Sequence, residues 1–269
     1  MRYCRFQWNG HSCYGRVELR TGEAWIVELI EAPEEDLAYR VEHGSSRAPE
    51  GFRATPLAAA ELLAPVTPSK IVCIGRNYRD HVKEILNSMP DDAPLSPVLF
   101  LKPPSSLLAP RGVIVRPRVA QRVDYEGELA VVIGKRARKI EAEQWRQYVR
   151  GYTVANDVTA RDLQYSDGQW ARAKGFDSFC PVGPVITDEI DPEQARIETR
   201  VNGELRQNES ATRLIFPIPL LIAFITDVMT LEPGDLVLTG TPAGIGMLDR
   251  DDRVVVSIEG VGALENTVL

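Results

Sequence analysis

Short apolar runs with the composition of β-strands recur along the chain, and several of them are joined by connections too short to hold a crossover helix. The runs lie at residues 15–19, 24–29, 71–74, 97–101, 128–134, 151–155, 236–240 and 253–258. Apolar runs of this length, bounded by glycine, proline and asparagine, predict strands. Parallel neighbours need long crossovers, so short connections favour antiparallel pairing. The sequence therefore predicts an α+β protein that is mainly β, with a mixed, largely antiparallel sheet.

Helical patterns are fewer. Helices are expected at residues 31–39, 77–86, 142–150 and 214–226. The last of these is the longest uncharged apolar stretch, but it contains two prolines and is shorter than the roughly 20 residues that span a bilayer. We expect it to be a buried helix that begins near Pro217 or Pro219, because proline is favoured in the first turn.

The sequence pattern changes near residue 66. Residues 1–66 contain short alternating runs and turn residues, and a segment with two prolines follows at 63–70. The total length of 269 residues suits one large domain with a small appendage. We therefore expect a small N-terminal β module in residues 1–66 and one larger domain in residues 67–269, which the motifs below identify as the catalytic domain.

Composition excludes some classes of partner. The formal net charge is −7 and the sequence pI is about 5.2, which argues against nucleic acid or an anionic membrane as the partner. The four cysteines match no zinc or redox spacing, so we expect reduced thiols. The N-terminus lacks the apolar run of a signal peptide, and a cytoplasmic location is expected.

Two glutamates open the strongest predicted strand. Residues i and i+2 of a strand point to the same face, so Glu126 and Glu128 are expected side by side. Their like charges repel unless a cation lies between them. Asp157, which follows another apolar strand, is a third candidate ligand, and an all-oxygen set favours Mg²⁺ or Mn²⁺ over zinc. Taken alone, the pair also fits a solvated strand face.

Longer motifs place this pair in a wider pattern. Stretches at 73–81, 101–107, 124–130, 151–162, 173–177 and 238–246 resemble signatures of the fumarylacetoacetate hydrolase (FAH) family, in the order in which that family carries them. The resemblance covers residues 68–269. It implies an FAH-type mixed β-sandwich roll, a homodimer, and a bound Mg²⁺ or Mn²⁺ held by Glu126, Glu128 and Asp157.

The resemblance also implies a shared chemistry. Its activities include acylpyruvate hydrolysis, oxaloacetate decarboxylation, and isomerisation in the breakdown of homoprotocatechuate. All of them pass through the enolate of a 2-oxo acid, whose carboxylate and keto oxygens together chelate a metal. The metal stabilises the negative charge that develops on the keto oxygen.

Further residues follow from the same motifs. The resemblance places Lys174 in the site, where its ammonium pairs with the enolate or with the metal-binding carboxylates. Arg76 is expected to clamp the substrate carboxylate, since guanidinium groups suit planar anions. Tyr78 and Gln164 are expected to add hydrogen bonds. Thr241 lies in a glycine-rich loop whose backbone can approach a ligand closely, and its hydroxyl is a candidate donor to the substrate.

A histidine and a glutamate share one face of the expected helix at 77–86. His81 and Glu84 are three residues apart, so the carboxylate can hold one imidazole nitrogen and leave the other free as a base. The resemblance implies that such a pair activates water. The segment 87–97 is expected to be mobile, which would let this helix act as a lid over the substrate.

Three functions remain open at this point. The first is hydrolysis or decarboxylation of a C–C bond in an acylpyruvate or an oxaloacetate-like acid, which the presence of both His81 and Glu84 favours. The second is isomerisation of 2-hydroxyhepta-2,4-diene-1,7-dioate in aromatic catabolism. The third is a non-catalytic binding module, whose signature would be a broken acidic triad, whereas here the triad and Lys174 are intact.

Overall fold

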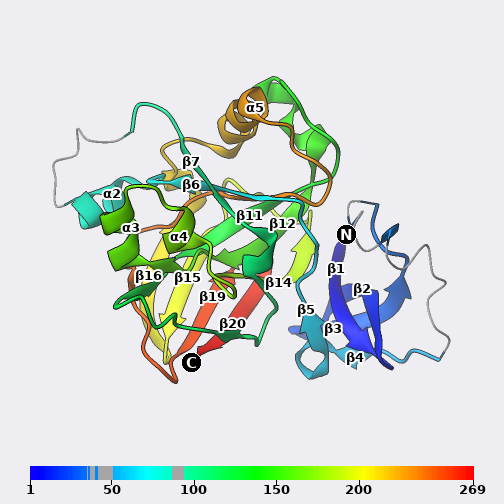
Figure 1. The fold of residues 1–269 in the computed structure, drawn as a ribbon. Helices are drawn as coiled ribbons and strands as arrows, with labels where there is room; N and C mark the ends of the chain where they lie inside the picture. Colours follow the sequence, from blue (N-terminus) through cyan, green and yellow to red (C-terminus); the bar gives the residue numbers. More distant parts are fainter. Residues whose placement is uncertain (35, 37–39, 42–50, 87–93) are drawn as a thin grey trace.

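The computed structural model describes residues 1–34, 36, 40–41, 51–86 and 94–269. Strands dominate this part of the chain (Figure 1). The strands are β1 Arg2–Trp8, β2 His11–Arg20, β3 Glu23–Ile30, β4 Thr55–Pro56, β5 Glu61–Leu63, β6 Ile71–Gly75, β7 Val98–Lys102, β8 Leu107–Leu108, β9 Val113–Ile114, β10 Val123–Tyr125, β11 Gly127–Ile133, β12 Val149–Asn156, β13 Thr159–Ala160, β14 Cys180–Thr187, β15 Arg196–Val201, β16 Glu204–Ser210, β17 Leu236–Leu238, β18 Gly246–Met247, β19 Arg253–Ile258 and β20 Gly262–Val268.

Helices are short by comparison. The α-helices are α2 Arg79–Leu86, α3 Arg161–Asp167, α4 Ala171–Lys174 and α5 Ile218–Val228, and the 3₁₀ helices are η1 Leu57–Ala59, η3 Pro104–Ser106, η4 Ala142–Tyr148 and η5 Ala211–Arg213. The predicted fold class, α+β and mainly β, is confirmed.

Three sheets are formed by the described strands. The largest has the order β4-β3-β2-β1-β14-β12-β11-β17-β6-β7, with β5 paired to β1 and β8 to β14. A five-stranded sheet runs β16-β15-β19-β20-β9, and a small one runs β13-β10-β18. Most neighbours are antiparallel, while β17–β6, β14–β8 and β20–β9 are parallel pairs. The mixed, largely antiparallel pairing predicted from the short connections is therefore confirmed.

The first strands extend the largest sheet. β1 pairs with β14 in the register Arg2↔Thr187 and Tyr3↔Ile186, so β1–β5 continue a sheet whose other strands lie after residue 70. Figure 1 shows these strands gathered at one end of the molecule. The division into residues 1–66 and 67–269 stays a prediction.

Strand β11 lies in the middle of this sheet and is buried on both faces. Leu129, Val131 and Ile133 point into a cluster that also contains the buried side chains of α5, whereas Ala130 and Val132 point into a second cluster with residues of β6 and β17. Because both faces are covered, the strand is a continuous apolar run instead of an alternating one. This is the run that the sequence shows after Glu128.

The five-stranded sheet packs closely on β11 at a single glycine. A Cβ added to Gly127 would lie 2.3 Å from Oγ1 of Thr199 on β15 and 2.8 Å from Cγ1 of Val256 on β19. Only a residue without a side chain fits between the two sheets here. Gly127 faces the second sheet, so the flanking glutamates Glu126 and Glu128 face the opposite way.

The helix expected at residues 142–150 is wrong in type and extent. Residues Ala142–Tyr148 form the 3₁₀ helix η4, and strand β12 already begins at Val149. Val149 pairs with Ile133, and the carbonyl of Tyr148 accepts hydrogen bonds from the backbone of Gly134 at 2.7 Å and of Lys135 at 3.3 Å. These contacts with the end of β11 require an extended backbone, so pairing overrides local helix propensity.

The other helix predictions have different outcomes. The buried helix is present as α5, which begins after Pro217 as expected. The helix predicted at 77–86 is present as α2, which starts two residues later. Of the helix predicted at 31–39, the described residues 31–34 and 36 are not helical, and residues 35 and 37–39 lie outside the described residues. Residues 87–93 of the predicted mobile segment also lie outside the described residues.

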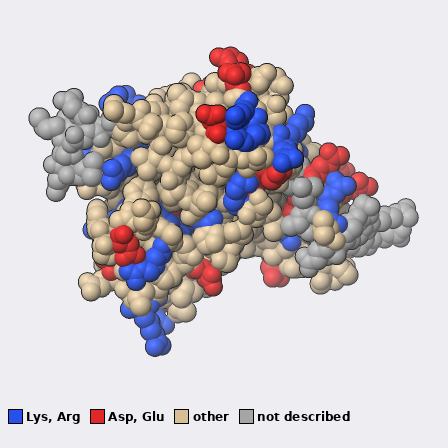
Figure 2. Space-filling model, turned by 45° about the horizontal axis from the view of Figure 1, so that its top comes forward, with Lys and Arg blue, Asp and Glu red and all other residues tan. Residues whose placement is uncertain are grey.

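Three observations bear on the expectations about charge, cysteines and membrane crossing. On the face in Figure 2, basic and acidic side chains are scattered over a largely uncharged surface. The four cysteines are buried, free thiols. No helix in the described part of the chain is long and apolar enough to cross a bilayer. Homodimerisation, the cytoplasmic location and the exclusion of nucleic acid stay predictions.

Two neighbouring leucines of α5 allow a matched test of this core. Leu221 is fully buried, whereas Leu220 is 40% exposed. Leu221→Ala leaves a cavity in the main cluster and should lower the free energy of unfolding by about 2–5 kcal/mol. Leu220→Ala should change it by about 0.5 kcal/mol or less. Urea denaturation followed by circular dichroism measures both values, and equal losses would contradict the packing of α5 described above.

Candidate active site

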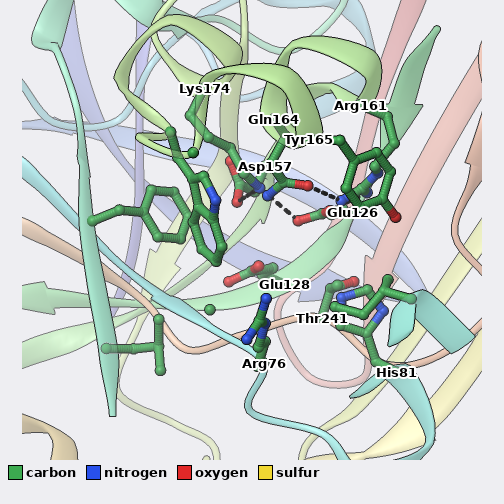
Figure 3. Close-up of a pocket in the computed structure, with 16 residues that line it drawn as sticks. Arg76, His81, Glu126, Glu128, Asp157, Arg161, Gln164, Tyr165, Lys174 and Thr241 are labelled. Atoms are coloured by element: carbon green, nitrogen blue, oxygen red, sulfur yellow. Dashed lines mark hydrogen bonds and ion pairs between the residues drawn. The ribbon is translucent and has the colours of Figure 1, made fainter. Parts of the chain in front are cut away.

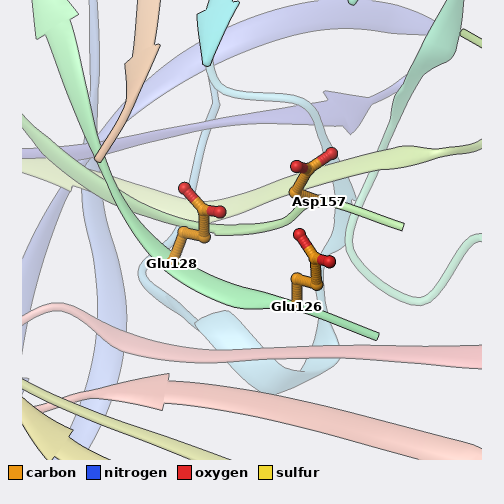
Figure 4. A group of neighbouring side chains, drawn as sticks. All are labelled: Glu126, Glu128 and Asp157. Atoms are coloured by element: carbon orange, nitrogen blue, oxygen red, sulfur yellow. The ribbon is translucent and has the colours of Figure 1, made fainter. Parts of the chain in front are cut away.

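Three carboxylates lie close together where β11 begins and its neighbour β12 ends. Glu126 precedes β11, Glu128 is its second residue, and Asp157 follows β12 directly. The register Gly127↔Asn156 places Asp157 beside Glu126, and the Asp157 backbone N–H donates to the Glu126 carbonyl at 2.8 Å. One oxygen from each carboxylate lies within 4.8 Å of the others (Figure 4). All three side chains are buried.

Buried cations compensate most of this negative charge. Nζ of Lys174 donates to Glu126 at 2.8 Å and also to Asp157, and Nζ of Lys102 donates to the other Asp157 oxygen at 2.6 Å. The Arg161 guanidinium donates to Glu126. Burial by itself raises the pKa of Glu126, but Lys174 and Arg161 outweigh it and hold that pKa well below its usual range.

Glu128 is compensated less, because Lys174 lowers its pKa only from beyond ion-pair distance. Its carboxylate accepts one hydrogen bond, from the backbone N–H of Gly240 at 2.7 Å, and forms no ion pair with a described residue. Burial and the nearby charges of Asp157 and Glu126 raise the pKa of Glu128 well above its usual value. The triad as a whole therefore gains from a further positive charge beside Glu128.

A hard divalent cation fits this donor set. The three side chains offer carboxylate oxygens alone, which Mg²⁺ and Mn²⁺ prefer, and three protein ligands leave positions for water or substrate. The carboxylate of Glu128, which forms no ion pair with a described residue, supplies the independent structural reason for a metal here. Glu126, Glu128 and Asp157 would hold the ion, as the sequence predicts.

The carboxylates lie in the wall of a cavity of about 250 Å³. Its lining consists of Ile74, Gly75, Arg76, His81, Ile85, Phe100, Glu126, Glu128, Asp157, Arg161, Gln164, Tyr165, Gly168, Trp170, Lys174 and Thr241. In Figure 3, Lys174, Gln164 and Arg161 reach the cavity from the helices drawn at the top, and Arg76, Thr241 and His81 reach it from the opposite side. The fold thus assembles eight of the ten predicted site residues around one space.

His81 and Glu84 are adjacent, but only the histidine lines this cavity. Nδ1 of His81 lies 3.3 Å from Oε2 of Glu84. Both Glu84 oxygens accept a hydrogen bond from the backbone N–H of Gly244, at 3.1 and 3.2 Å. A proton on Nδ1 would be directed at Glu84, and Nε2 of the neutral ring would then be available as a base. Glu84 thus links the orientation of the imidazole to the loop that follows Thr241.

Tyr78 lies elsewhere. Its side chain is 2% exposed and packs in the main hydrophobic cluster. Among the described residues it borders a separate surface depression, together with Arg79 and Arg213, and it is absent from the lining of the carboxylate cavity. A contact between Tyr78 and substrate stays a prediction.

Arg76 reaches the cavity through an unusual backbone conformation. Its φ is +60°, which is uncommon outside glycine, so the surrounding structure must hold it. The next residue provides that support, because the Asn77 amide donates to the Thr239 carbonyl at 2.8 Å and to the Phe216 carbonyl at 3.1 Å. Within the described residues Nε of Arg76 has no hydrogen-bond partner.

The hydroxyl of Thr241 forms hydrogen bonds within the protein, beside Gly127. It donates to the carbonyl of Gly127 at 2.9 Å and accepts from the side-chain amide of Gln207 at 2.8 Å. The Gln207 oxygen in turn accepts from the Gly127 N–H at 3.0 Å. Gln207 and Thr241 therefore hold the backbone between the two glutamates. A direct contact from Thr241 to substrate stays a prediction.

Sequence reasoning missed several residues of this site. Lys102 and Arg161 lie inside motifs that were recognised, so basic residues in those motifs were an available signal. Gln207, Phe100, Tyr165 and Trp170 lie outside all the motifs, and no spacing connects them to the acidic triad. Only the folded chain brings them to the site.

The comparisons with known proteins agree with this site. The model of the fumarylacetoacetate (FAA) hydrolase C-terminal family matches residues 70–269, so the chain belongs to the fumarylacetoacetate hydrolase family. The chain is 44% identical over 226 residues to oxaloacetate tautomerase YisK of Bacillus subtilis. The aligned region covers 79% of this chain and 74% of the relative.

Solved structures match over the full length of the chain. The crystal structure of 2-hydroxyhepta-2,4-diene-1,7-dioate isomerase from Mycobacterium marinum has a TM-score of 0.84 and 39% identity, covering 100% of this chain and 98% of that one. The fumarylacetoacetate hydrolase from psychrophilic Exiguobacterium antarcticum has a TM-score of 0.82 and 38% identity, covering 100% and 99%. The resemblance seen in the sequence is confirmed, and the relatives include tautomerase, isomerase and hydrolase enzymes.

Removal of one carboxylate tests the metal site without any substrate. Glu128→Gln keeps the shape of the side chain but removes its charge, so affinity for Mg²⁺ and Mn²⁺ should fall by at least about 10-fold. Isothermal titration calorimetry on metal-free protein measures this loss. Glu84→Gln, which changes a carboxylate outside the cavity, is the matched control and should bind metal normally. Unchanged affinity in Glu128→Gln would remove Glu128 from the ligand set.

Proposed function

We propose that this protein is a divalent-metal-dependent enzyme that acts on small 2-oxo acids through their enolates. The observation that carries the proposal is the cluster of three buried carboxylates, which shares one small cavity with the base candidate His81 and the cations Lys174 and Arg76. The cavity of about 250 Å³ is smaller than the roughly 300–1,000 Å³ of drug-sized sites, which suits a small metabolite.

Each group has a defined task in this proposal. A bound Mg²⁺ or Mn²⁺ would act as a Lewis acid toward the 2-oxo group. The Lys174 ammonium, already held between Glu126 and Asp157, adds positive charge where the enolate oxygen develops. Arg76 is the cavity-lining guanidinium with no ion pair among the described residues, so it is available for a substrate carboxylate.

Proton transfer at the carbon beside the keto group is the step assigned to His81. Its imidazole takes a proton from that carbon, the C–H electron pair becomes the C=C bond of the enolate, and the C=O π pair moves onto the keto oxygen. Protonation of that oxygen gives the enol. In the opposite direction the enol O–H loses its proton, and the imidazolium returns a proton to the carbon to give the keto form. These proton transfers alone amount to keto–enol tautomerisation of an acid such as oxaloacetate, and the name of the tautomerase relative supports it.

Cleavage of a carbon–carbon bond is the second candidate. The proximity of Glu84 to His81 favours it, because an oriented imidazole can take a proton from water as the water attacks the second carbonyl of an acylpyruvate. The enolate of pyruvate would leave and be stabilised as above. Decarboxylation of oxaloacetate gives the same enolate without any water. Isomerisation of 2-hydroxyhepta-2,4-diene-1,7-dioate needs proton transfer alone and remains the alternative.

A panel of reactions tests the proposal. With Mg²⁺, enol-oxaloacetate should lose its ultraviolet absorbance rapidly, and acetylpyruvate and oxaloacetate should be assayed beside it for release of pyruvate. EDTA should abolish every activity. Activity that persists at full rate in EDTA would contradict the metal assignment, and failure of all three substrates would shift the proposal to longer dienedioates.

The role of His81 separates the candidates further. His81→Ala should lower turnover by about 10²–10⁴-fold in reactions that need its base, namely tautomerisation and hydrolysis, and much less in decarboxylation. Steady-state kinetics on the three substrates measure this pattern. Lys83→Ala, an exposed change on the same helix, is the control and should leave every rate unchanged. Equal losses in all three reactions would count against His81 as the base.

A further inference from the structure

The cavity has an aromatic side that the proposed chemistry does not use. Phe100 on β7 and Trp170, which directly precedes α4, both line it. Their ring centroids are 5.2 Å apart at an interplanar angle of 71°, a favourable edge-to-face arrangement. Nζ of Lys174 lies 4.9 Å from the centroid of Phe100, so the aromatic pair adjoins the charged cluster directly.

The indole of Trp170 is held from several directions. Beyond its contact with Phe100, the Arg76 guanidinium lies 5.9 Å from the indole centroid. On another side the indole packs against the backbone of β6 at Gly75. A Cβ added to Gly75 would lie only 2.6 Å from Cζ3 and 2.9 Å from Cη2 of the indole. The ring therefore has no room to retreat toward Gly75 if a ligand pushes against it.

Trp170 is also tied to the catalytic lysine. The backbone N–H of Lys174 donates to the carbonyl of Trp170 at 3.0 Å, which closes the single turn of α4. One short turn thus supplies both a cation for the carboxylate cluster and an aromatic wall for the cavity.

We propose that Trp170 limits the length of the 2-oxo acid that the cavity accepts, and that the protein selects acids with a short chain beyond the keto group. The proposal rests on the proposed function, since the carboxylate cluster must hold the 2-oxo end of the ligand. The remaining chain then extends toward Phe100 and Trp170. A longer chain would then push against a ring that has no room to retreat toward Gly75.

Binding of a graded series of ligands tests this limit without turnover. Pyruvate, 2-oxopentanoate and 2-oxooctanoate are titrated calorimetrically into the Mg²⁺-loaded protein. Affinity should fall with chain length in the natural protein. In Trp170→Ala the affinity for 2-oxooctanoate relative to pyruvate should rise by at least about 10-fold, because one methylene in a close-fitting pocket already changes selectivity by about 10–200-fold.

Matched variants keep the result interpretable. Tyr165→Ala removes another cavity-lining aromatic side chain, but one that is 63% exposed, and should not change the length preference. Trp170→Phe keeps an aromatic ring beside Phe100 and should show an intermediate preference. Circular dichroism and Mg²⁺ affinity establish that each variant is folded and retains the carboxylate cluster.

A double-mutant cycle isolates the contact between Gly75 and the indole. Gly75→Ala should force the indole into the cavity and weaken binding of 2-oxopentanoate by about 10-fold or more. In the Trp170→Ala background the same change should have little effect, because the nearest remaining atom is Cγ1 of Val98 at 3.6 Å. Equal effects of Gly75→Ala in both backgrounds would overturn the role of the indole.

The outcomes separate this proposal from the proposed function. One outcome is that Trp170→Ala relaxes the length preference in a protein that turns over none of the tested substrates. That result would support Trp170 as the length limit and would contradict the proposed reaction. Normal turnover of short 2-oxo acids with an unchanged length preference in Trp170→Ala would contradict the role of Trp170 as a length limit and would support the proposed reaction. Absence of 2-oxo acid binding to the natural, Mg²⁺-loaded protein would overturn both.

Discussion

Mutual repulsion among three buried carboxylates is the constraint that the rest of this structure serves. Glu126, Glu128 and Asp157 each lie below 5% exposure, where unpaired negative charge is costly. Lys174, Lys102 and Arg161 offset that charge at Glu126 and Asp157, and they come from α4, β7 and α3. Glu128 remains without a cationic partner in this part of the chain. A site of this kind could bind a divalent cation, because no described residue forms an ion pair with Glu128.

The sheets hold these charges in place. Pairing of β11 with β12 fixes Asp157 relative to Glu126, and close packing of the second sheet at Gly127 fixes which way the glutamates face. Gln207, from that second sheet, bonds to the Gly127 backbone and to Thr241. The edge that carries the three carboxylates is therefore built from two packed layers, in which small displacements are resisted by the surrounding core.

The family to which the chain belongs includes enzymes with different reactions, and the structure suggests how one site serves several of them. In the proposed function, the carboxylate cluster and Lys174 would act on the 2-oxo end of a ligand. Groups on the rest of the lining, such as His81 and the aromatic pair Phe100 and Trp170, would meet the remainder of the ligand. On this proposal the charged part of the cavity sets the type of chemistry, and the other part sets the substrate and the outcome.

The sequence alone determined the strand-rich fold, the buried helix α5 and the identity of the acidic triad, because strand periodicity, proline position and motif order are local signals. It misjudged η4, where pairing of Val149 with Ile133 decided the backbone. It also gave no sign that Trp170 or Gln207 belongs to the site, or that Tyr78 lies outside the cavity lining. Such placements arise from contacts between residues far apart in the chain, so only the tertiary structure decided them.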